Sequence, residues 1–258
     1  MGLLKTTGIV TKTTKYSENS LIVTIITKDL GRISAIAQNA RTSKSRLAAG
    51  LQLFAYSEIV VYEGRTKTGL FKINEMNVIE SFGNIRISLE SLAYASYFAE
   101  VTNVVTVEGE TDENALSLLL NCLFALDKSL CPPEKIKAVF QWRSAAISGY
   151  EPRIDACSKC GREDGEVFFD IFEGECFCPE CKADRAGCAA LSDGMRKTVR
   201  YISEAENKKI FSFDLGEKAI KYLGELGERY IEAQFDRNFS TLDYLKKVIG
   251  LNNDEKKD

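Results

Sequence analysis

The first eighty residues alternate between apolar and polar positions with a period of two. Thr, Ile and Val dominate short runs bounded by polar or glycine-containing turns, which is typical of β-strands. We expect five strands, at residues 6–14, 20–27, 32–37, 51–62 and 69–79. A polar loop is expected at residues 39–46. Five strands in so short a segment predict a small barrel, either an OB-fold or an SH3-like barrel.

From about residue 88 the apolar residues recur at helical spacing instead. Thr111 or Asp112 is expected to cap the second helix, and Gly149 to end the third. Asp214 with Glu217 is a predicted capping pair for a later helix. The expected helices lie at residues 89–105, from 112 onward, 133–147, 192–205, 214–235 and from 240 onward.

These patterns predict an α+β chain: an N-terminal five-stranded OB-fold barrel followed by an all-α helical domain with an inserted cysteine-rich module. The barrel is assigned to residues 1–80, the first part of the helical domain to 81–154 and its second part to 190–251. Residues 155–189 break the helical pattern and form the inserted module. The polar residues 252–258 are expected to be a disordered tail.

Charge is distributed unevenly along the chain. The 34 Lys and Arg residues against 37 Asp and Glu residues give a net charge of −3. Residues 1–80 hold 11 of the basic and 6 of the acidic residues, a balance of +5, so the remaining residues carry 23 − 31 = −8. A polyanion would therefore be expected to contact the N-terminal barrel.

Several classes of function are disfavoured by what the sequence lacks. It contains no histidine, so a Ser-His-Asp or Cys-His catalytic arrangement is excluded. It contains neither a P-loop GxxxxGK[ST] nor a GxGxxG after a strand. An enzyme with a structural metal stays an alternative, but no catalytic site is evident, and we expect a non-enzymatic protein. No apolar run approaches the length of a membrane span and no signal peptide is recognisable, so a cytoplasmic protein is expected.

Two CxxC pairs give the clearest chemical signal. Cys157 and Cys160 are followed, after seventeen residues, by Cys178 and Cys181. This spacing is typical of a Zn²⁺ site in which two tight turns each supply two thiolates to a tetrahedral cage. Disulfides are the alternative, but a reducing compartment disfavours them. Four thiolates leave no open position for water, so the expected Zn²⁺ is structural.

The choice of the third ligand stays open at this point. Cys176 lies two residues before Cys178 in the segment GECFCPEC and is a possible substitute for it. The remaining cysteines are a spare thiol in the module and two expected small core residues in the helical region: Cys188, Cys122 and Cys131.

Two segments of the sequence resemble the RecO family. The opening GIVTKTTKYSENSLIVTIITKDLGRISAIAQNARTSKSRLAAGLQLF is similar to the family's N-terminal domain, with Tyr-x-Glu before the second strand and a basic loop ending in Lys-Ser. The segment GYEPRIDACSKCG is similar to the family's signature before the zinc pair and is the more specific match. The resemblance implies an OB-fold, a helical body and a zinc-binding module.

The same resemblance implies a recombination and repair mediator, associated with the nucleoid. Such proteins bind single- and double-stranded DNA, anneal complementary strands, work with RecR, contact the acidic C-terminal tail of single-strand-binding protein, and so help to load RecA. OB-folds bind strands through a basic groove and aromatic platforms. The expected DNA contacts are Lys12, Lys15, Tyr16, Arg32, Arg41, Lys44 and Arg46. The expected partner-binding cations are Lys135, Lys137, Arg143, Arg196, Lys197 and Arg200.

One binding function competes with this interpretation. A β-barrel with a zinc ribbon would also suit an RNA-binding factor of transcription or translation. The relative affinity for single-stranded DNA and RNA of one sequence distinguishes the two.

Overall fold

A computed structural model describes residues 2–42, 45–63, 69–182, 185 and 187–255, with the side chains of residues 252–255 excepted. The chain divides into two compact units, Met1–Asp127 with Thr241–Asp258, and Lys128–Ser240. The predicted boundaries at residues 81, 155 and 190 follow secondary structure and stay predictions. Among the described residues, no helix is both long and apolar enough to cross a membrane.

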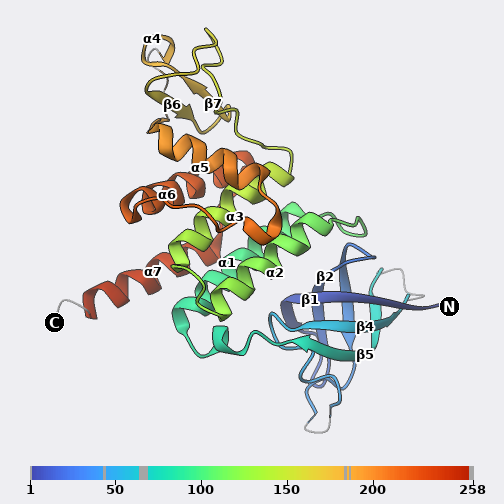
Figure 1. The fold of residues 1–258 in the computed structure, drawn as a ribbon. Coiled ribbons are helices and arrows are strands. Elements are labelled where there is room, and N and C mark those ends of the chain that lie inside the picture. The colour runs from blue at the N-terminus through green and yellow to red at the C-terminus, as the bar shows by residue number, and fades with distance from the viewer. Residues whose placement is uncertain (1, 43–44, 64–68, 183–184, 186, 256–258) are drawn as a thin grey trace. The chain divides into compact units, whose positions relative to one another are not determined.

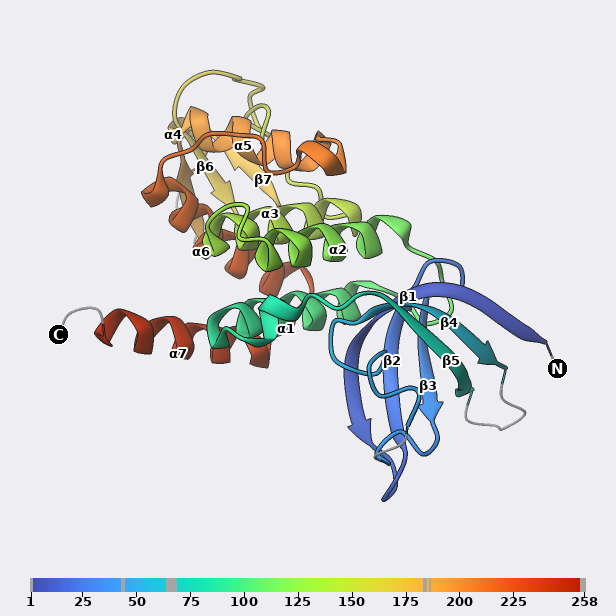
Figure 2. The same ribbon diagram turned by 60° about the horizontal axis from the view of Figure 1, so that its bottom comes forward.

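A closed five-stranded barrel forms the N-terminal part of the first unit, as predicted (Figures 1 and 2). Its strands are β1 (Leu3–Lys15), β2 (Leu21–Thr27), β3 (Arg32–Ala37), β4 (Tyr56–Tyr62) and β5 (Phe71–Glu80). The order around the barrel is β1-β2-β3-β5-β4, and β4 returns to pair with β1. Strands β3 and β5 run parallel, while the other neighbours are antiparallel. This order fits the OB-type barrel of the two predicted alternatives.

The barrel interior is filled by alternate residues of the strands. On β2 and β3, Val23, Ile25 and Ala35 are fully buried, while the residues between them are half-buried on the outer face. The turn after β2 requires glycine at position 31. Gly31 has a φ of +66°, and a Cβ atom there would lie 2.2 Å from the carbonyl oxygen of Glu110. Only glycine fits this turn, because a side chain would be both strained and obstructed.

The fourth strand is shorter than the sequence indicates. The expected strand 51–62 begins only at Tyr56. Phe54 adopts a left-handed backbone conformation with a φ of +67° and is buried, and its N–H donates to the carbonyl of Val10 at 2.8 Å. The apolar residues before Tyr56 therefore form a packed turn, which hydrophobicity alone does not distinguish from a strand.

Three helices complete the first unit. They are α1 (Leu89–Val105), α2 (Glu113–Asp127) and α7 (Ser240–Glu255), with a short 3-10 helix η1 (Gly83–Arg86) before α1. Asp112 caps α2, because its carboxylate accepts the N–H of Ala115 at 2.9 Å. Glu100 of α1 accepts the N–H of Thr241 at 2.9 Å and so holds the start of α7. Helix α7 continues to Glu255, into the stretch expected to be a disordered tail, and 256–258 lie outside the described residues.

The second unit combines helices with a small antiparallel sheet of order β7-β6-β8. Its elements are α3 (Pro133–Ile147), β6 (Val167–Asp170), β7 (Glu175–Phe177), α4 (Pro179–Lys182), β8 (Cys188–Leu191), α5 (Asp193–Glu204), η2 (Asn207–Lys209) and α6 (Glu217–Gln234). Trp142 of α3 lies at the centre, with ring centroids 5.6 Å from Phe169 and 5.4 Å from Tyr230. Its indole N–H donates to the carbonyl of Leu223 at 3.1 Å. Strand β6 and helices α3 and α6 thus share a single aromatic core.

The predicted cap of α6 is wrong. The N-cap residue is Gly216, and no side chain caps the helix. Asp214 lies two residues before the N-cap, so it is too early in the chain to accept an N–H of the first turn in a capping box. Glu217 is instead the first residue of the helix, where its negative charge favours the positive end of the helix dipole.

Candidate metal centre and nucleic-acid interface

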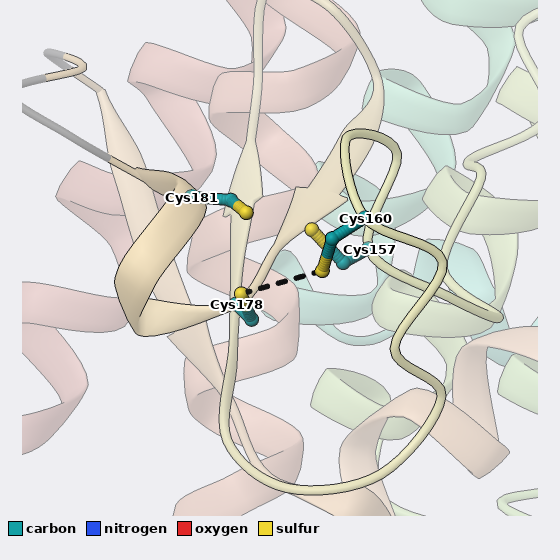
Figure 3. Close-up of side chains that lie close together, drawn as sticks. All are labelled: Cys157, Cys160, Cys178 and Cys181. Atoms are coloured by element: carbon teal, nitrogen blue, oxygen red, sulfur yellow. Dashed lines mark hydrogen bonds between the residues drawn. The ribbon is translucent and has the colours of Figure 1, made fainter.

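Four cysteines from two separate turns converge in the second unit (Figure 3). Cys157 and Cys160 lie in the loop before β6, Cys178 follows the last residue of β7, and Cys181 lies in α4. Their four Sγ atoms all lie within 4.8 Å of one another. The cysteines predicted from the CxxC spacing therefore form one cluster.

Backbone hydrogen bonds shape each of the two turns. In the first turn the N–H of Gly161 donates to the carbonyl of Cys157 at 2.8 Å, and Gly161 has a φ of +75°. In the second turn the N–H groups of Cys181 and Lys182 donate to the carbonyl of Cys178 at 3.0 and 2.9 Å. Each turn closes tightly enough to direct two thiols to the same point, which is the geometric reason for the CxxC spacing.

The cluster has the dimensions of a tetrahedral metal site. Zn–S bonds of about 2.3 Å imply S–S edges of about 3.8 Å in a tetrahedron. The Sγ atoms of Cys160 and Cys178 are 3.8 Å apart. Cys157 and Cys178 are buried, whereas Cys160 is exposed. These four residues could hold one thiophilic ion and leave no position for a reactive water.

The thiols of the cluster differ in acidity. Desolvation raises the pKa of Cys157, but hydrogen bonds from the backbone N–H groups of Cys178, Cys160 and Lys159 outweigh this effect and lower the pKa to about 6. The hydrogen bond with Cys178 is the largest cause that raises the pKa of Cys181, to about 12. An ion bound here would displace the thiol protons, because thiolates are the metal ligands.

Cys176 and Cys188 occupy different positions from these four. Cys176 lies inside β7, pairs with Phe169 of β6, and is fully buried, and this burial raises its pKa to about 12. Cys188 pairs with Asp170 on the other side of β6. The Sγ cluster thus contains Cys178 and not its suggested substitute, because Cys178 lies at the turn into α4 and Cys176 within a strand.

One outer face of the barrel carries several of the predicted DNA contacts. Lys12 is exposed on β1 opposite Thr24 of β2, which lies opposite Ser34 of β3. Arg32 is two residues before Ser34 and therefore faces the same way. A register shift between Val10 and Lys12 interrupts the alternation of β1, and beyond it Lys12 faces outward.

Lys72 on β5 lies on the same face and is missing from the residues predicted from sequence. It is exposed and pairs with Ile36 of β3, two residues beyond Ser34. The alternation of β5, which places Lys72 on the outer face, could be read from the sequence. The pairing of Lys72 with Ile36 could not, because the parallel contact of β3 with β5 arises from barrel closure and not from a hairpin.

The remaining predicted contacts gather at one end of the barrel. The guanidinium of Arg41 donates to the carbonyl of Glu18 at 3.0 Å, and its backbone N–H donates to the carbonyl of Asn19 at 3.3 Å. These bonds place Arg41 beside the turn between β1 and β2, which follows Lys15 and carries Tyr16. Tyr16 is 60% exposed and Arg46 is exposed. Lys44 lies outside the described residues.

These cations have no acidic partners in the described parts of the chain. Neither an ion pair nor another electrostatic contact with a carboxylate is found there for the following five: Lys12, Lys15, Arg41, Arg46 and Lys72. Their positive charge is therefore available to a ligand. Arg32 is half-buried instead, and its backbone carbonyl accepts the N–H of Gly109 at 3.0 Å.

The six predicted partner-binding cations lie on α3 and α5, and each has a bonding partner within the second unit. The ammonium of Lys135 donates to the carbonyl of Phe213 at 2.6 Å, and the buried Lys137 pairs with Glu228 at 2.5 Å. Lys197 pairs with Asp193 at 2.7 Å. Arg143 donates to the carbonyls of Ile202 and Ser203. Arg196 donates to the carbonyls of Asp155 and Glu163, and Arg200 to the carboxylate of Asp155. Only Lys197 and Arg200 are exposed among the six.

Comparison with known proteins accounts for almost the whole chain. Residues 1–82 match the family model "Recombination protein O N terminal", and residues 86–243 match "Recombination protein O C terminal". DNA repair protein RecO of Acetivibrio thermocellus is 36% identical over 249 residues, which cover 96% of this chain and 98% of that protein. The proteins of the same name from Alkaliphilus metalliredigens and Caldicellulosiruptor saccharolyticus are 31% and 30% identical, covering 95% and 96% of this chain and 100% of each relative. The chain therefore belongs to the recombination protein O (RecO) family.

Proposed function

We propose that this protein is a non-enzymatic mediator of recombinational DNA repair. It binds single- and double-stranded DNA, anneals complementary strands and, with RecR, helps to load RecA onto strands coated with single-strand-binding protein. The observation that carries the proposal is an outer barrel face with unpaired cations, in a chain whose residues 1–82 and 86–243 match the repair family. The protein acts in the cytoplasm, at the nucleoid.

DNA is held by the outer face of β1, β2, β3 and β5 together with the adjoining loops. Lys12 and Lys72 lie on the two sides of this face, and the half-buried Ile22, Thr24 and Ile36 lie between them. Cations at the edges neutralise phosphates, while the central residues face the sugars and bases. Such a surface grips backbones and has little means to distinguish base sequences.

The end of the barrel extends this grip. Tyr16 supplies an exposed aromatic ring in the turn between β1 and β2, to which Arg41 donates through the carbonyl of Glu18, and base stacking on a ring is tolerant of sequence. Arg32, Lys44 and Arg46 also contact the DNA backbone. Arg46 is exposed in the loop after β3, whereas Arg32 is half-buried.

The four-cysteine cluster binds structural Zn²⁺ through Cys157, Cys160, Cys178 and Cys181. The ion supplies cross-linking of two turns that have only a small apolar cluster of their own, formed by Cys157, Phe177 and Cys178. No catalytic role is proposed for it, since four thiolates complete the coordination.

The acidic tail of single-strand-binding protein is proposed to contact the second unit. Lys197 and Arg200 of α5 are the candidates, because their side chains are 74% and 45% exposed. The other four cations predicted for this role are committed to internal bonds, so their part is to support the surface.

Annealing of complementary strands coated with single-strand-binding protein tests the proposal. The full-length protein should accelerate annealing, and the combined Lys12→Gln, Arg41→Gln and Lys72→Gln variant should lose most of this acceleration. Lys5→Gln is a matched control, because Lys5 is an exposed lysine of β1 that pairs with Val60 of β4, seven residues from Lys12. No acceleration by the unmodified protein, or tighter binding of RNA than of DNA of the same sequence, would overturn the proposal.

A further inference from the structure

Arg196 is an unusual residue in the second unit, because its charge is buried and no ion pair is found for it among the described residues. The residue is 8% exposed on α5. Its Nε and Nη1 atoms are buried and have no hydrogen-bond partner among the described residues. No ion pair with a carboxylate is found for it in the same parts of the chain. A buried cation in this state needs a nearby negative charge.

The carboxylates around Arg196 are engaged elsewhere. Asp193, on the same helix, is exposed and pairs with Lys197 at 2.7 Å. The carboxylate of Asp155 pairs with Arg200, one helical turn further along α5. Lys197 is the main cause of the lowered pKa of Asp193, and the charge of Arg196 adds to it, but neither acid forms an ion pair with the buried guanidinium.

The hydrogen bonds that Arg196 does make lead to the cysteine cluster. Its Nη2 atom donates to the carbonyl of Asp155 at 3.2 Å and to that of Glu163 at 2.8 Å. Asp155 precedes Cys157 by two residues, and Glu163 follows Cys160 by three. One amino group of the guanidinium thus joins both ends of the loop that carries the first cysteine pair.

We propose that Arg196 is the positioning residue of the metal centre: its Nη2 amino group fixes the first cysteine loop against α5, and its charge offsets the negative charge of the metal-thiolate group. Zn²⁺ with four thiolates carries a net charge of −2, and the two carbonyls that Arg196 bonds lie within three residues of Cys157 and Cys160. Metal occupancy and the stability of α5 are then coupled through this buried side chain, in addition to the exposed pair of Arg200 with Asp155. The inference rests on the proposed metal site and adds a residue outside the ligand set.

Zinc competition and thermal unfolding of the full-length chain test this inference. Arg196→Met removes the charge and both hydrogen bonds, and should weaken zinc binding by about tenfold or more in competition with a chromogenic chelator, as loss of outer-shell partners does elsewhere. Arg196→Lys keeps the charge without the guanidinium group, so its zinc affinity should lie between those of Arg196→Met and the unmodified protein. Lys209→Met is the control, because this exposed lysine of the same unit pairs with Glu206 at 3.3 Å, away from the cysteine loop.

The thermal transition separates this role from ordinary packing. Arg196→Met should lower the midpoint of the zinc-loaded protein and leave that of the chelator-treated protein nearly unchanged. Equal lowering in both states, or unchanged zinc affinity, would overturn the inference while leaving the metal site itself in place. A wild-type protein that binds no zinc would instead remove the metal site, and this inference with it.

Hydrogen exchange on the unmodified protein covers the case in which the variants do not fold. Removal of zinc should deprotect the amides of α5 from Arg196 onward, and should leave α1 of the first unit protected. Unchanged protection of α5 after zinc removal would contradict the coupling.

Discussion

The barrel and the cysteine module of residues 155–189 are both small β structures, but different forces stabilise them. The barrel closes on itself around a continuous core that includes Val10, Ile25 and Val61. The apolar cluster beside the metal turns contains only Cys157, Phe177, Cys178 and the half-buried Cys181. The barrel thus closes around a core of its own and leaves its outer charges free to bind a ligand. The module instead packs Phe169 of its sheet against Trp142 of α3 and Tyr230 of α6, and the two turns that carry its cysteines have few apolar contacts.

The cations of the two regions differ in the same way. Lys12 and Lys72 on the barrel have no acidic partner in the described residues, while Arg162 of the module pairs with Glu180 at 3.2 Å. This pairing raises the pKa of Arg162. Counting positive residues in the sequence therefore overstates how many can contact DNA in the second unit.

Loss of one cysteine ligand is expected to have the largest effect. Cys157→Ser should abolish stoichiometric zinc and destabilise the second unit severely, because a structural zinc supplies about 10–16 kcal/mol of apparent binding free energy. Typical domains have only about 5–15 kcal/mol of stability. Mass spectrometry of the full-length protein measures its zinc content, and differential scanning calorimetry of the same protein measures the loss of stability. Cys188→Ser, in the same module but outside the cluster, should keep its zinc; a Cys157→Ser protein with full zinc content would refute the assignment.

The buried ion pair between α3 and α6 comes next in size. Glu228→Gln leaves the ammonium of Lys137 buried without a counter-charge, so the free energy of unfolding should fall by about 3–5 kcal/mol. Urea denaturation measures the change. Lys197→Gln breaks an exposed pair and should alter stability little. Equal effects of the two substitutions would show that burial does not distinguish these cations.

Neutralising the barrel face should weaken DNA binding without unfolding the protein. The five free cations predict a slope of about −3.5 for the logarithm of single-strand affinity against the logarithm of salt concentration. The combined change Lys12→Gln, Arg41→Gln and Lys72→Gln should reduce the magnitude of this slope by about 2. Fluorescence anisotropy across a salt series measures both values, with Lys5→Gln as the control. An unchanged slope would place the DNA elsewhere.

A smaller effect is expected from the aromatic ring at the end of the barrel. Tyr16→Ala should cost about 1 kcal/mol of single-strand binding free energy, at the lower end of the range for base stacking. The salt slope should stay the same, because the ring carries no charge. Tyr16→Phe keeps the stacking surface and should bind as the unmodified protein does. A loss with Tyr16→Phe as large as with Tyr16→Ala would point to the hydroxyl group instead of the ring.

Local patterns predicted the elements that are long enough to show a period. The barrel strands and the helices from Leu89 to Val105 and from Pro133 to Ile147 follow from alternation, helical spacing and the flanking proline and glycine. The strands of the module were not predicted, because three or four residues are too few to establish a period. The turn at Phe54 was mistaken for strand because an apolar run looks the same in both.

The sequence by itself determined the candidate metal ligands, since two residues between cysteines fix a tight turn and two such turns make a cage. It also determined the excess of positive charge at the N-terminal end. Only the tertiary structure decided which cations stay free: barrel closure placed Lys72 beside the face of β3, whereas helix packing buried Lys137 against Glu228 and directed Arg196 to the cysteine loop. The physical reason is that a charge in water keeps its hydration until it is brought to a partner, and partners distant in sequence meet only when the chain folds.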